Sequence, residues 1–361
     1  MGQIESNAQF INFMLQPAFT VKDGIVESVN EPARGYGVEA GQSVDEMLLL
    51  GKTEYSEFTE GCLYLTLSFM GGRCGASVRR MESFDLFTLE QEADEEELQA
   101  MALAAQELRA PLSNVMTIAD QLFPVADQEE NPAVADQISR INRGLFQMLR
   151  IVSNMSDAYR YSQQTEQRCV TVELAAYFQE IFDKITQTLS KANMTLAFEN
   201  LNRPIHGLVE PEKLERAIHN IVSNAVKFSA KGGAIYAKLT CRGTMLYLTV
   251  CDRGEGIAPD VQGTIHTRYR RMPGLEDRRF GVGLGMLMIR SAAAAHGGTV
   301  LIDHPEDCGT RVTMTMAIQQ NPESFVRART LFFDYAGERD HLLVELADVL
   351  PPECYRSDCI N

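Results

Sequence analysis

The amino-acid sequence predicts an α+β multidomain protein, and three features of the chain support that fold class. Short β-like runs separated by turn residues fill the first quarter of the chain, and apolar heptads follow them. Beyond residue 166, helical stretches alternate with β-rich ones. A chain of 361 residues, of which 45% are hydrophobic, is long enough for two or three domains with separate cores.

Residues 7–88 are predicted to form a small α+β module. The stretch "PAFTVKDGIVESVNEPA" contains a strand, a turn at Asp23-Gly24 and a second strand. The stretch "CLYLTLSFMGGRCGASVRRM" is typical of another hairpin, which turns at Gly71-Gly72.

Two runs of apolar side chains, spaced alternately by three and four residues, predict a coiled-coil helical hairpin. The acidic run at 90–99 is interpreted as a solvated helix face. The first apolar run comprises Leu98, Met101, Ala105, Leu108, Leu112, Val115, Ala119 and Leu122. The second comprises Ile138, Ile141, Leu145, Met148, Val152 and Met155. Because one hairpin cannot bury both seams well, the pattern favours a homodimer with a dimeric four-helix bundle.

The rest of the chain predicts an α/β sandwich and a tail. Helical stretches near 174–190, 211–229 and 284–296 alternate with β-rich runs such as "GAIYAKLTCRGTMLYLTVCD". In the tail, a β-like "VRARTLFFDY" precedes a short helix, "DHLLVELADVL", which Pro351-Pro352 stops. Its compact apolar face predicts that the helix docks on the protein itself, and the alternative is a helix that binds a partner.

Composition excludes several classes of function. A net charge of −16 argues against a broad nucleic-acid surface, although one nucleotide in a local pocket remains compatible with it. The eight cysteines include no CxxC pair, so neither a zinc site nor a disulfide framework is expected, and a reducing compartment is favoured. No signal peptide and no apolar stretch of about 18 residues is found, so a cytoplasmic protein is expected.

The helix "PEKLERAIHNIVSNAVKFS" contains the first candidate ligand-binding residues. Asn220, Asn224 and Lys227 are spaced four and three residues apart and therefore share one face. Because asparagine is a mediocre helix former, two asparagines on one face of a helix point to a ligand. A plain amphipathic helix is the alternative interpretation of this segment.

Two glycine-containing segments follow this helix. In "VCDRGEGIAPD", Asp252 ends an apolar strand, where its carboxylate can accept a hydrogen bond from an exocyclic amine. Gly254 and Gly256 come next and allow close approach of the backbone. In "FGVGLGMLMIR", three glycines come just before an apolar helix: Gly281, Gly283 and Gly285. The first N–H groups of such a helix can bind phosphate. The basic "HTRYRRMPGLEDRR" between the two segments suits a lid over phosphate.

These segments, in this order along the chain, resemble the motifs of a known protein family. Residues from about 90 to 318 resemble sensor histidine kinases, through "QELRAPL", "HNIVSNAVKFS", "DRGEGI" and "GVGLGMLMIRSAAAAHGG". The resemblance implies an ATP-binding α/β sandwich of the Bergerat (GHKL) type. Through "DGIVESVNEPA", the first segment is similar to a PAS-like α/β sensor module. The implied domains are a PAS-like sensor domain (1–90), a degenerate helical-hairpin dimerisation domain (91–165), a histidine-kinase-like ATPase domain (166–320) and a C-terminal extension (321–361).

The resemblance also implies cofactors, partners and residue roles. ATP and Mg²⁺ would bind, with Asn224 on the metal and with Asn220 and Lys227 on the nucleotide. Asp252 would contact the adenine amino group, and Gly254 and Gly256 would lie beside it. The phosphate-side loop would contain Gly281, Gly283 and Gly285. A homodimer, with a response regulator or a partner kinase, would be the signalling assembly.

One departure from the family decides the activity. The helix of "QELRAPL" begins with the acceptor histidine in the family, and here it begins with Gln106. An amide nitrogen has a delocalised lone pair and cannot accept the phosphoryl group as imidazole does. Glu107, which matches the assisting base, is kept, and no histidine lies within 91–163. A two-component signalling pseudokinase is therefore predicted.

Other interpretations of the same residues remain open. The chain could be a working kinase that phosphorylates a histidine on a partner, a Bergerat-fold ATPase or serine kinase, or a non-enzymatic dimeric scaffold. The first 90 residues contain no histidine that could ligate haem, so a module without a cofactor is expected there.

Overall fold

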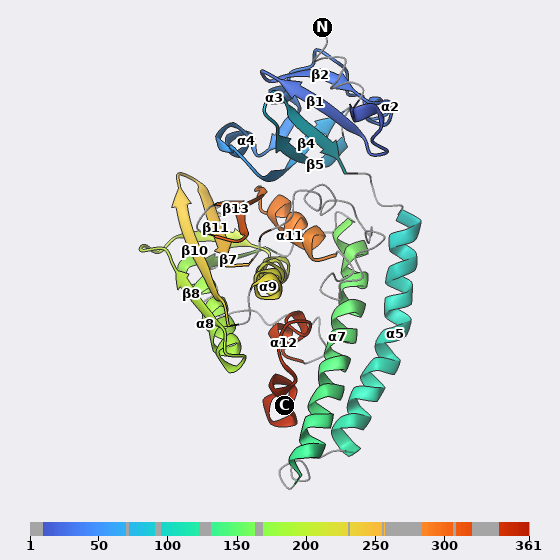
Figure 1. Cartoon of the computed structure of the whole chain (residues 1–361), viewed down its shortest axis with the longest axis vertical. Helices are drawn as coiled ribbons and strands as arrows, with labels where there is room; N and C mark the ends of the chain where they lie inside the picture. Colours follow the sequence, from blue (N-terminus) through green and yellow to red (C-terminus); the bar gives the residue numbers. More distant parts are fainter. Residues whose placement is uncertain are drawn as a thin grey trace.

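The computed structural model describes residues 10–69, 72–90, 95–122, 131–162, 169–229, 232–254, 256, 284–305, 308–319 and 339–360. A β-rich N-terminal module lies at one end of an α/β layer, and the C-terminal segment is docked between that layer and a long helical hairpin (Figure 1). The α+β multidomain fold class predicted from the sequence is therefore confirmed.

The N-terminal module is an antiparallel sheet with short helices. Its strand order is β2-β1-β6-β5-β4. Asp23 and Gly24 both have positive φ, 50° and 77°, which is the backbone of the predicted tight turn between β1 and β2. The second predicted hairpin joins β4 to β5, and its Gly71 lies outside the described residues. The elements are β1 (Ala18–Lys22), β2 (Ile25–Val29), α2 (Glu31–Arg34), α3 (Val44–Met47), β3 (Leu48–Leu50), α4 (Lys52–Glu57), β4 (Cys62–Phe69), β5 (Gly72–Arg80) and β6 (Asp85–Leu89).

Two long helices, α5 (Glu95–Leu122) and α7 (Pro132–Ser162), form the predicted antiparallel hairpin (Figure 1). The apolar seams divide into two sets of alternate positions. One set is buried inside the hairpin and against neighbouring elements: Leu98, Ala105, Leu112, Ile138, Leu145 and Val152. The other set is about half exposed: Leu108, Val115, Ile141 and Met148. One hairpin thus leaves four positions of the apolar pattern about half exposed.

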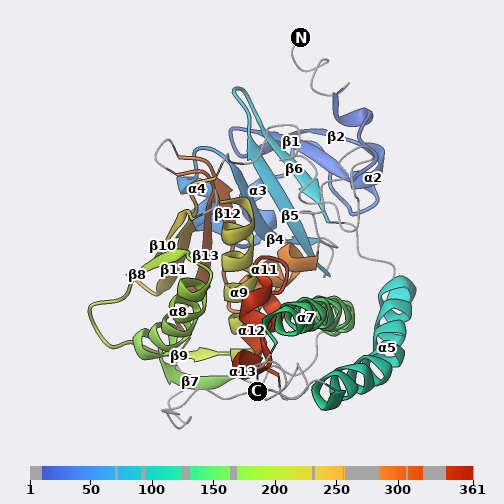
Figure 2. The same cartoon turned by 60° about the horizontal axis from the view of Figure 1, so that its bottom comes forward.

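The α/β layer is the predicted sandwich. Its five strands follow the order β8-β10-β11-β13-β12, and three helices pack on one face (Figures 1 and 2). The strands are β8 (Thr195–Glu199), β10 (Ala234–Arg242), β11 (Met245–Cys251), β12 (Val300–Asp303) and β13 (Arg311–Ala317), and the helices are α8 (Leu174–Lys191), α9 (Pro211–Phe228) and α11 (Leu284–Ala295). A separate two-stranded sheet contains β7 (Val170–Glu173) and β9 (His206–Val209).

The two larger sheets join edge to edge, which the sequence did not predict. Strand β4 of the N-terminal module pairs antiparallel with β12, so that Tyr64 lies opposite Val300. Nearby, the Arg290 guanidinium lies 4.8 Å from the centre of the Tyr64 ring and forms an ion pair with Glu90. Because backbone hydrogen bonds cross the junction, the N-terminal module and the α/β layer share one continuous sheet.

The tail lies between α7 and α9 (Figures 1 and 2). It consists of α12 (His341–Glu345), a 3-10 turn η1 (Pro352–Tyr355) and α13 (Ser357–Ile360). Asp340 caps α12 by accepting from the N–H groups of Leu342 and Leu343. The side chains that pack inward are Leu342, Leu343, Val344, Leu346 and Leu350. The prediction that this segment docks on the protein itself is confirmed, and the stretch "VRARTLFFDY" lies outside the described residues.

Candidate functional site

Helix α9 contributes the largest number of side chains to the candidate site. Pro211 stands in its first turn, where a missing N–H costs nothing. Its apolar face is buried in the core through Leu214, Ile218, Ile221, Val222 and Ala225. On the other side, Arg216, Asn220, Ser223 and Lys227 follow one another at helical spacing.

The predicted binding face of α9 is divided into two halves. Asn220 is only 1% exposed, whereas Asn224 and Lys227 are partly exposed. The Asn220 side chain is also fully engaged: Nδ2 donates to the backbone oxygen of Arg216 at 2.9 Å and to Glu345 at 3.4 Å. Its Oδ1 accepts from Arg150 at 3.3 Å. In this structure Asn220 therefore serves packing between elements, and Asn224 and Lys227 remain on the open half.

Asp252 follows β11 directly and is 4% exposed. Its Oδ1 accepts hydrogen bonds from the backbone N–H of Gly254 at 2.8 Å and of Thr310 at 3.1 Å, which fixes the orientation of the carboxyl group. Burial raises the pKa of Asp252, and these two backbone hydrogen bonds oppose that shift. A buried and oriented carboxyl group is suited to recognise one specific donor.

Two of the predicted glycines, Gly254 and Gly285, lie close to the two ends of the α9 segment from Asn220 to Phe228. A Cβ at Gly254 would lie 2.2 Å from the backbone oxygen of Phe228, the last residue of α9. A Cβ at Gly285 would lie 2.7 Å from Asn220 Oδ1. Gly256 has a φ of 76°, which favours glycine. The span of α9 from Asn220 to Phe228 is about 12 Å at 1.5 Å per residue. Gly281, Gly283 and the "HTRYRRMPGLEDRR" segment lie outside the described residues.

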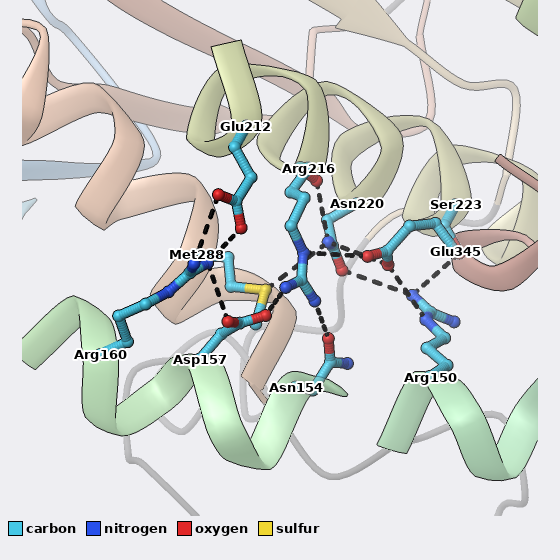
Figure 3. A network of polar contacts seen from close by, with 10 residues as sticks. All are labelled: Arg150, Asn154, Asp157, Arg160, Glu212, Arg216, Asn220, Ser223, Met288 and Glu345. Atoms are coloured by element: carbon cyan, nitrogen blue, oxygen red, sulfur yellow. Dashed lines mark hydrogen bonds and ion pairs between the residues drawn. The ribbon is translucent and has the colours of Figure 1, made fainter. Parts of the chain in front are cut away.

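A buried ionic network joins α9, α7 and the tail (Figure 3). Arg216 is completely buried and forms an ion pair with Asp157 of α7. Its Nε donates to Glu345 of the tail at 3.1 Å, and its Nη2 donates to Asn154 at 2.7 Å. Sequence analysis did not identify Arg216. Its position four residues before Asn220 shows that the two side chains share one face of the helix. Spacing within one helix does not show which residues of other elements contact that face.

Arg150 of α7 makes the second half of this network. Its Nε lies 3.4 Å from Glu345 Oε2, and its Nη1 lies 2.7 Å from Asp348 Oδ2. Its Nη2 donates to Ser223 of α9 at 3.3 Å. The Glu345 carboxylate, which is 0% exposed, thus lies between two arginines that belong to two different elements (Figure 3).

The predicted acceptor position lies on the exposed surface of α5. Gln106 and its neighbour Glu107 are both exposed. Gln106 lines a groove of about 530 Å³ between α5 and α7, together with Gln99, Arg109, Ser156, Tyr159 and Arg160. Arg160 forms ion pairs with Asp157 and with Glu212 in the first turn of α9. The groove therefore opens beside the helix that carries Asn224 and Lys227.

Comparisons with known proteins agree with this arrangement. Residues 209–320 match the family described as histidine kinase-, DNA gyrase B-, and HSP90-like ATPase. The chain is 25% identical over 242 residues to the sensor histidine kinase WalK of Bacillus subtilis, covering 65% of this chain and 39% of that protein. The chain is therefore similar to sensor histidine kinases, and residues 209–320 match their ATPase domain. Its ATPase domain is therefore of the GHKL type, as the motifs predicted.

Other histidine kinases match over a similar part of the chain. The adaptive-response sensory kinase SasA of Synechocystis is 25% identical over 253 residues, covering 65% of this chain and 64% of that protein. The hybrid signal transduction histidine kinase D of Dictyostelium discoideum is 26% identical over 255 residues, and the match covers 66% of this chain but 16% of that protein. The chain thus spans between about one sixth and two thirds of the length of these three relatives.

Solved structures give more distant matches. Full-length ShkA in complex with AMPPNP gives a TM-score of 0.49 at 20% identity, covering 62% of this chain and 47% of that chain. ThkA in complex with the response regulator TrrA gives 0.39 at 13% identity, covering 86% and 98%. Within the described ranges, no helix combines the length and the apolar character needed to cross a membrane.

Proposed function

We propose that this protein binds Mg-ATP along α9 and signals without phosphorylating itself. The observation that carries the proposal is Gln106, which is exposed on α5 at the position where the family resemblance implies the acceptor histidine. Phosphoryl transfer needs a nucleophile in line with the γ-phosphate, and the glutamine amide does not supply one. No histidine lies within 91–163 to replace it.

The proposed nucleotide site uses residues from three elements. Asn224 holds Mg²⁺, and Lys227 contacts the phosphates from the open half of α9. Asn220 contacts the nucleotide once its bonds to Glu345 and Arg150 are broken. Asp252 accepts a hydrogen bond from the adenine amino group, with Gly254 and Gly256 beside the ring. Gly281 and Gly283 belong to the phosphate-side loop, and Gly285 follows them in the first turn of α11. The match to a family of ATPases and the fixed orientation of the Asp252 carboxyl group support these roles.

The proposed domain organisation follows the same logic. Residues 1–90 are a PAS-like sensor domain, 91–165 the dimerisation hairpin, 166–320 the ATPase domain and 321–361 a C-terminal extension. The two-strand junction between β4 and β12 supports a sensor that acts directly on the ATPase domain. A response regulator or a partner kinase is the proposed recipient of the signal.

A second candidate is a kinase that phosphorylates a histidine of a partner protein. The groove at Gln106 favours it, because Arg109 lines the groove and Glu107 is kept next to Gln106 in the sequence. Incubation of the protein with γ-labelled ATP separates the two candidates. Label on a histidine-bearing partner would support the kinase acting in trans, and an absence of label on any partner would support the pseudokinase.

Asp252→Asn is expected to weaken ATP binding by roughly 10- to 100-fold, since a hydrogen bond to a charged group contributes about 1.5–3 kcal/mol. The asparagine Oδ1 can still accept from Gly254 and Thr310, so the fold should be retained. Isothermal calorimetry with Mg-ATP measures the change. Asp183→Asn, at an exposed position of α8, is the control and should bind like wild type. A wild type that binds no nucleotide would exclude the proposed function.

We also propose a homodimer through the hairpin, because four positions of its apolar seam are about half exposed. Leu108 and Met148 are 50% and 51% exposed, so lysines there should leave one hairpin intact but place charges between two of them. Leu108→Lys with Met148→Lys is expected to yield monomers by light scattering at micromolar concentration. Asn114→Lys with Thr117→Lys, at exposed positions off the seam, should remain dimeric. A monomeric mass for wild type would contradict the dimer.

A further inference from the structure

We propose that the C-terminal segment 340–360 is a built-in inhibitor that competes with the nucleotide for α9 and holds the ATPase domain against the hairpin. The inference rests on the proposed function, because it assigns a regulator to the same nucleotide site. Three features of the segment carry it: its anchoring on α7, the position of its Glu345 carboxylate, and the part of α9 that it covers.

The segment is anchored on α7 by apolar and polar contacts. Tyr355 is fully buried, and its ring meets the Phe146 ring edge-on, with centroids 5.2 Å apart. Asn142 of α7 donates to the Tyr355 backbone oxygen at 3.1 Å. Arg143 and Gln147 both donate to the Ala347 backbone oxygen at 3.2 Å. These contacts occupy successive turns of α7, so the segment is held over a length of helix rather than at one point.

Glu345 connects this anchor to the ATPase domain. Its two carboxylate oxygens meet Arg216 and Asn220 of α9 on one side and Arg150 of α7 on the other (Figure 3). Buried charges are stable only when they are paired, and here the tail supplies a carboxylate to both buried arginines. Removal of Glu345 would leave two guanidinium groups close to each other at the boundary between the hairpin and the ATPase domain. The tail therefore favours the arrangement in which the two domains are in contact.

The segment and α7 together cover the half of α9 that precedes Asn224. Arg216, Asn220 and Ser223 are buried beneath Arg150 and Glu345, while Asn224 and Lys227 remain partly exposed. Asn220 can reach a nucleotide only if its bonds to Glu345 and Arg150 break. Docking of the tail and binding through Asn220 therefore exclude each other. By linkage, the docked tail lowers the affinity for nucleotide, and nucleotide loosens the tail to the same extent.

His219, next to Asn220, provides an independent measure of docking. Its side chain is buried, and its Nδ1 has no hydrogen-bond partner within the described ranges. Burial lowers the pKa of His219 to about 4, and the charged or titratable groups that face it are Glu345, Asp340, His341 and Arg216. A released tail would expose the ring and return the pKa toward about 6.5. Because the docked form binds the proton less well, docking should weaken as pH falls from about 6.5 toward 4.

Full-length variants test this inference. Leu346→Lys with Leu350→Lys places charges at two fully buried positions of the tail and should release it. Glu345→Gln keeps the shape of the side chain but removes the charge between the arginines. Glu353→Lys, at an exposed position of η1, is the matched control. Circular dichroism monitors folding, limited proteolysis and the NMR titration of His219 monitor docking, and calorimetry measures the affinity for the ATP analogue AMPPNP with Mg²⁺.

The released variant is expected to bind AMPPNP at least tenfold more tightly than wild type, with Glu345→Gln between the two and Glu353→Lys unchanged. Saturating AMPPNP should in turn speed cleavage of the wild-type tail. A released tail with unchanged affinity overturns the inference and leaves the nucleotide site standing. Should the double lysine variant not fold, an unchanged affinity of Glu345→Gln together with unchanged tail cleavage would overturn it equally. Binding by no variant would instead refute the proposed function, and the inhibitor with it.

Discussion

Gln106→His is expected to turn a protein that forms no phosphohistidine into one that phosphorylates itself. Imidazole supplies the lone pair that the glutamine amide lacks, and it titrates near neutral pH. The exposed position of Gln106 on α5 tolerates the change, and Glu107 lies beside it as a base. Acid-labile, alkali-stable label from γ-labelled Mg-ATP is the measurement, and wild type should show none above background. We expect the effect to be largest when the tail is also released by Leu346→Lys with Leu350→Lys.

Two control variants test whether the restored label depends on the position of the imidazole and on ATP binding. Gln99→His places an imidazole in the same groove but without Glu107 as its neighbour, and it should remain unlabelled. Gln106→His combined with Asp252→Asn should lose most of the restored label if ATP binds as proposed. Robust phosphohistidine on the wild-type protein alone would refute the pseudokinase. A Gln106→His protein that binds ATP well and stays unlabelled would show that the catalytic geometry itself is lost.

Arg216→Met is expected to cost the folded protein about 3–5 kcal/mol, which would be the largest stability change among the variants considered. The guanidinium is fully buried, and its removal leaves the carboxylates of Asp157 and Glu345 without their shared partner. Those carboxylates belong to α7 and the tail, so α9 should separate from both. Denaturant unfolding followed by circular dichroism measures the loss, and limited proteolysis should show earlier cleavage between the hairpin and the ATPase domain.

The comparison variants locate the cause of that loss. Arg242→Met removes an arginine whose side chain is 73% exposed and whose carboxylate partner is 4.0 Å away, so it should change stability by less than about 1 kcal/mol. Arg216→Met with Asp157→Asn removes a buried charge of each sign and should be less harmful than Arg216→Met alone. Equal stability of Arg216→Met and wild type would mean that the network contributes nothing to the contact between domains.

The sequence alone was sufficient to predict a structural feature wherever the physical cause of that feature is local. The turn at Asp23-Gly24 was predicted because two residues with positive φ between strands favour those residue types, and the structure has that backbone. The hairpin was predicted because apolar spacing defines a helix face regardless of what covers it. The loss of the acceptor is also a prediction from the sequence alone, because nucleophilicity belongs to one side chain and the glutamine amide of Gln106 lacks it.

Only the tertiary structure decided how these parts meet. Strands β4 and β12 are separated by more than 200 residues, and every edge strand offers the same unpaired backbone groups, so their pairing leaves no pattern in the sequence. Asn220 has the spacing of a ligand-binding residue, yet its amide group donates a hydrogen bond to Glu345, which lies 125 residues further along the chain. A charged residue shows its sign in the sequence, but its burial and its partner depend on elements brought together by folding. The chemistry of Asn220 therefore follows from its residue type, whereas access to it depends on the tail and on α7, which fold against it.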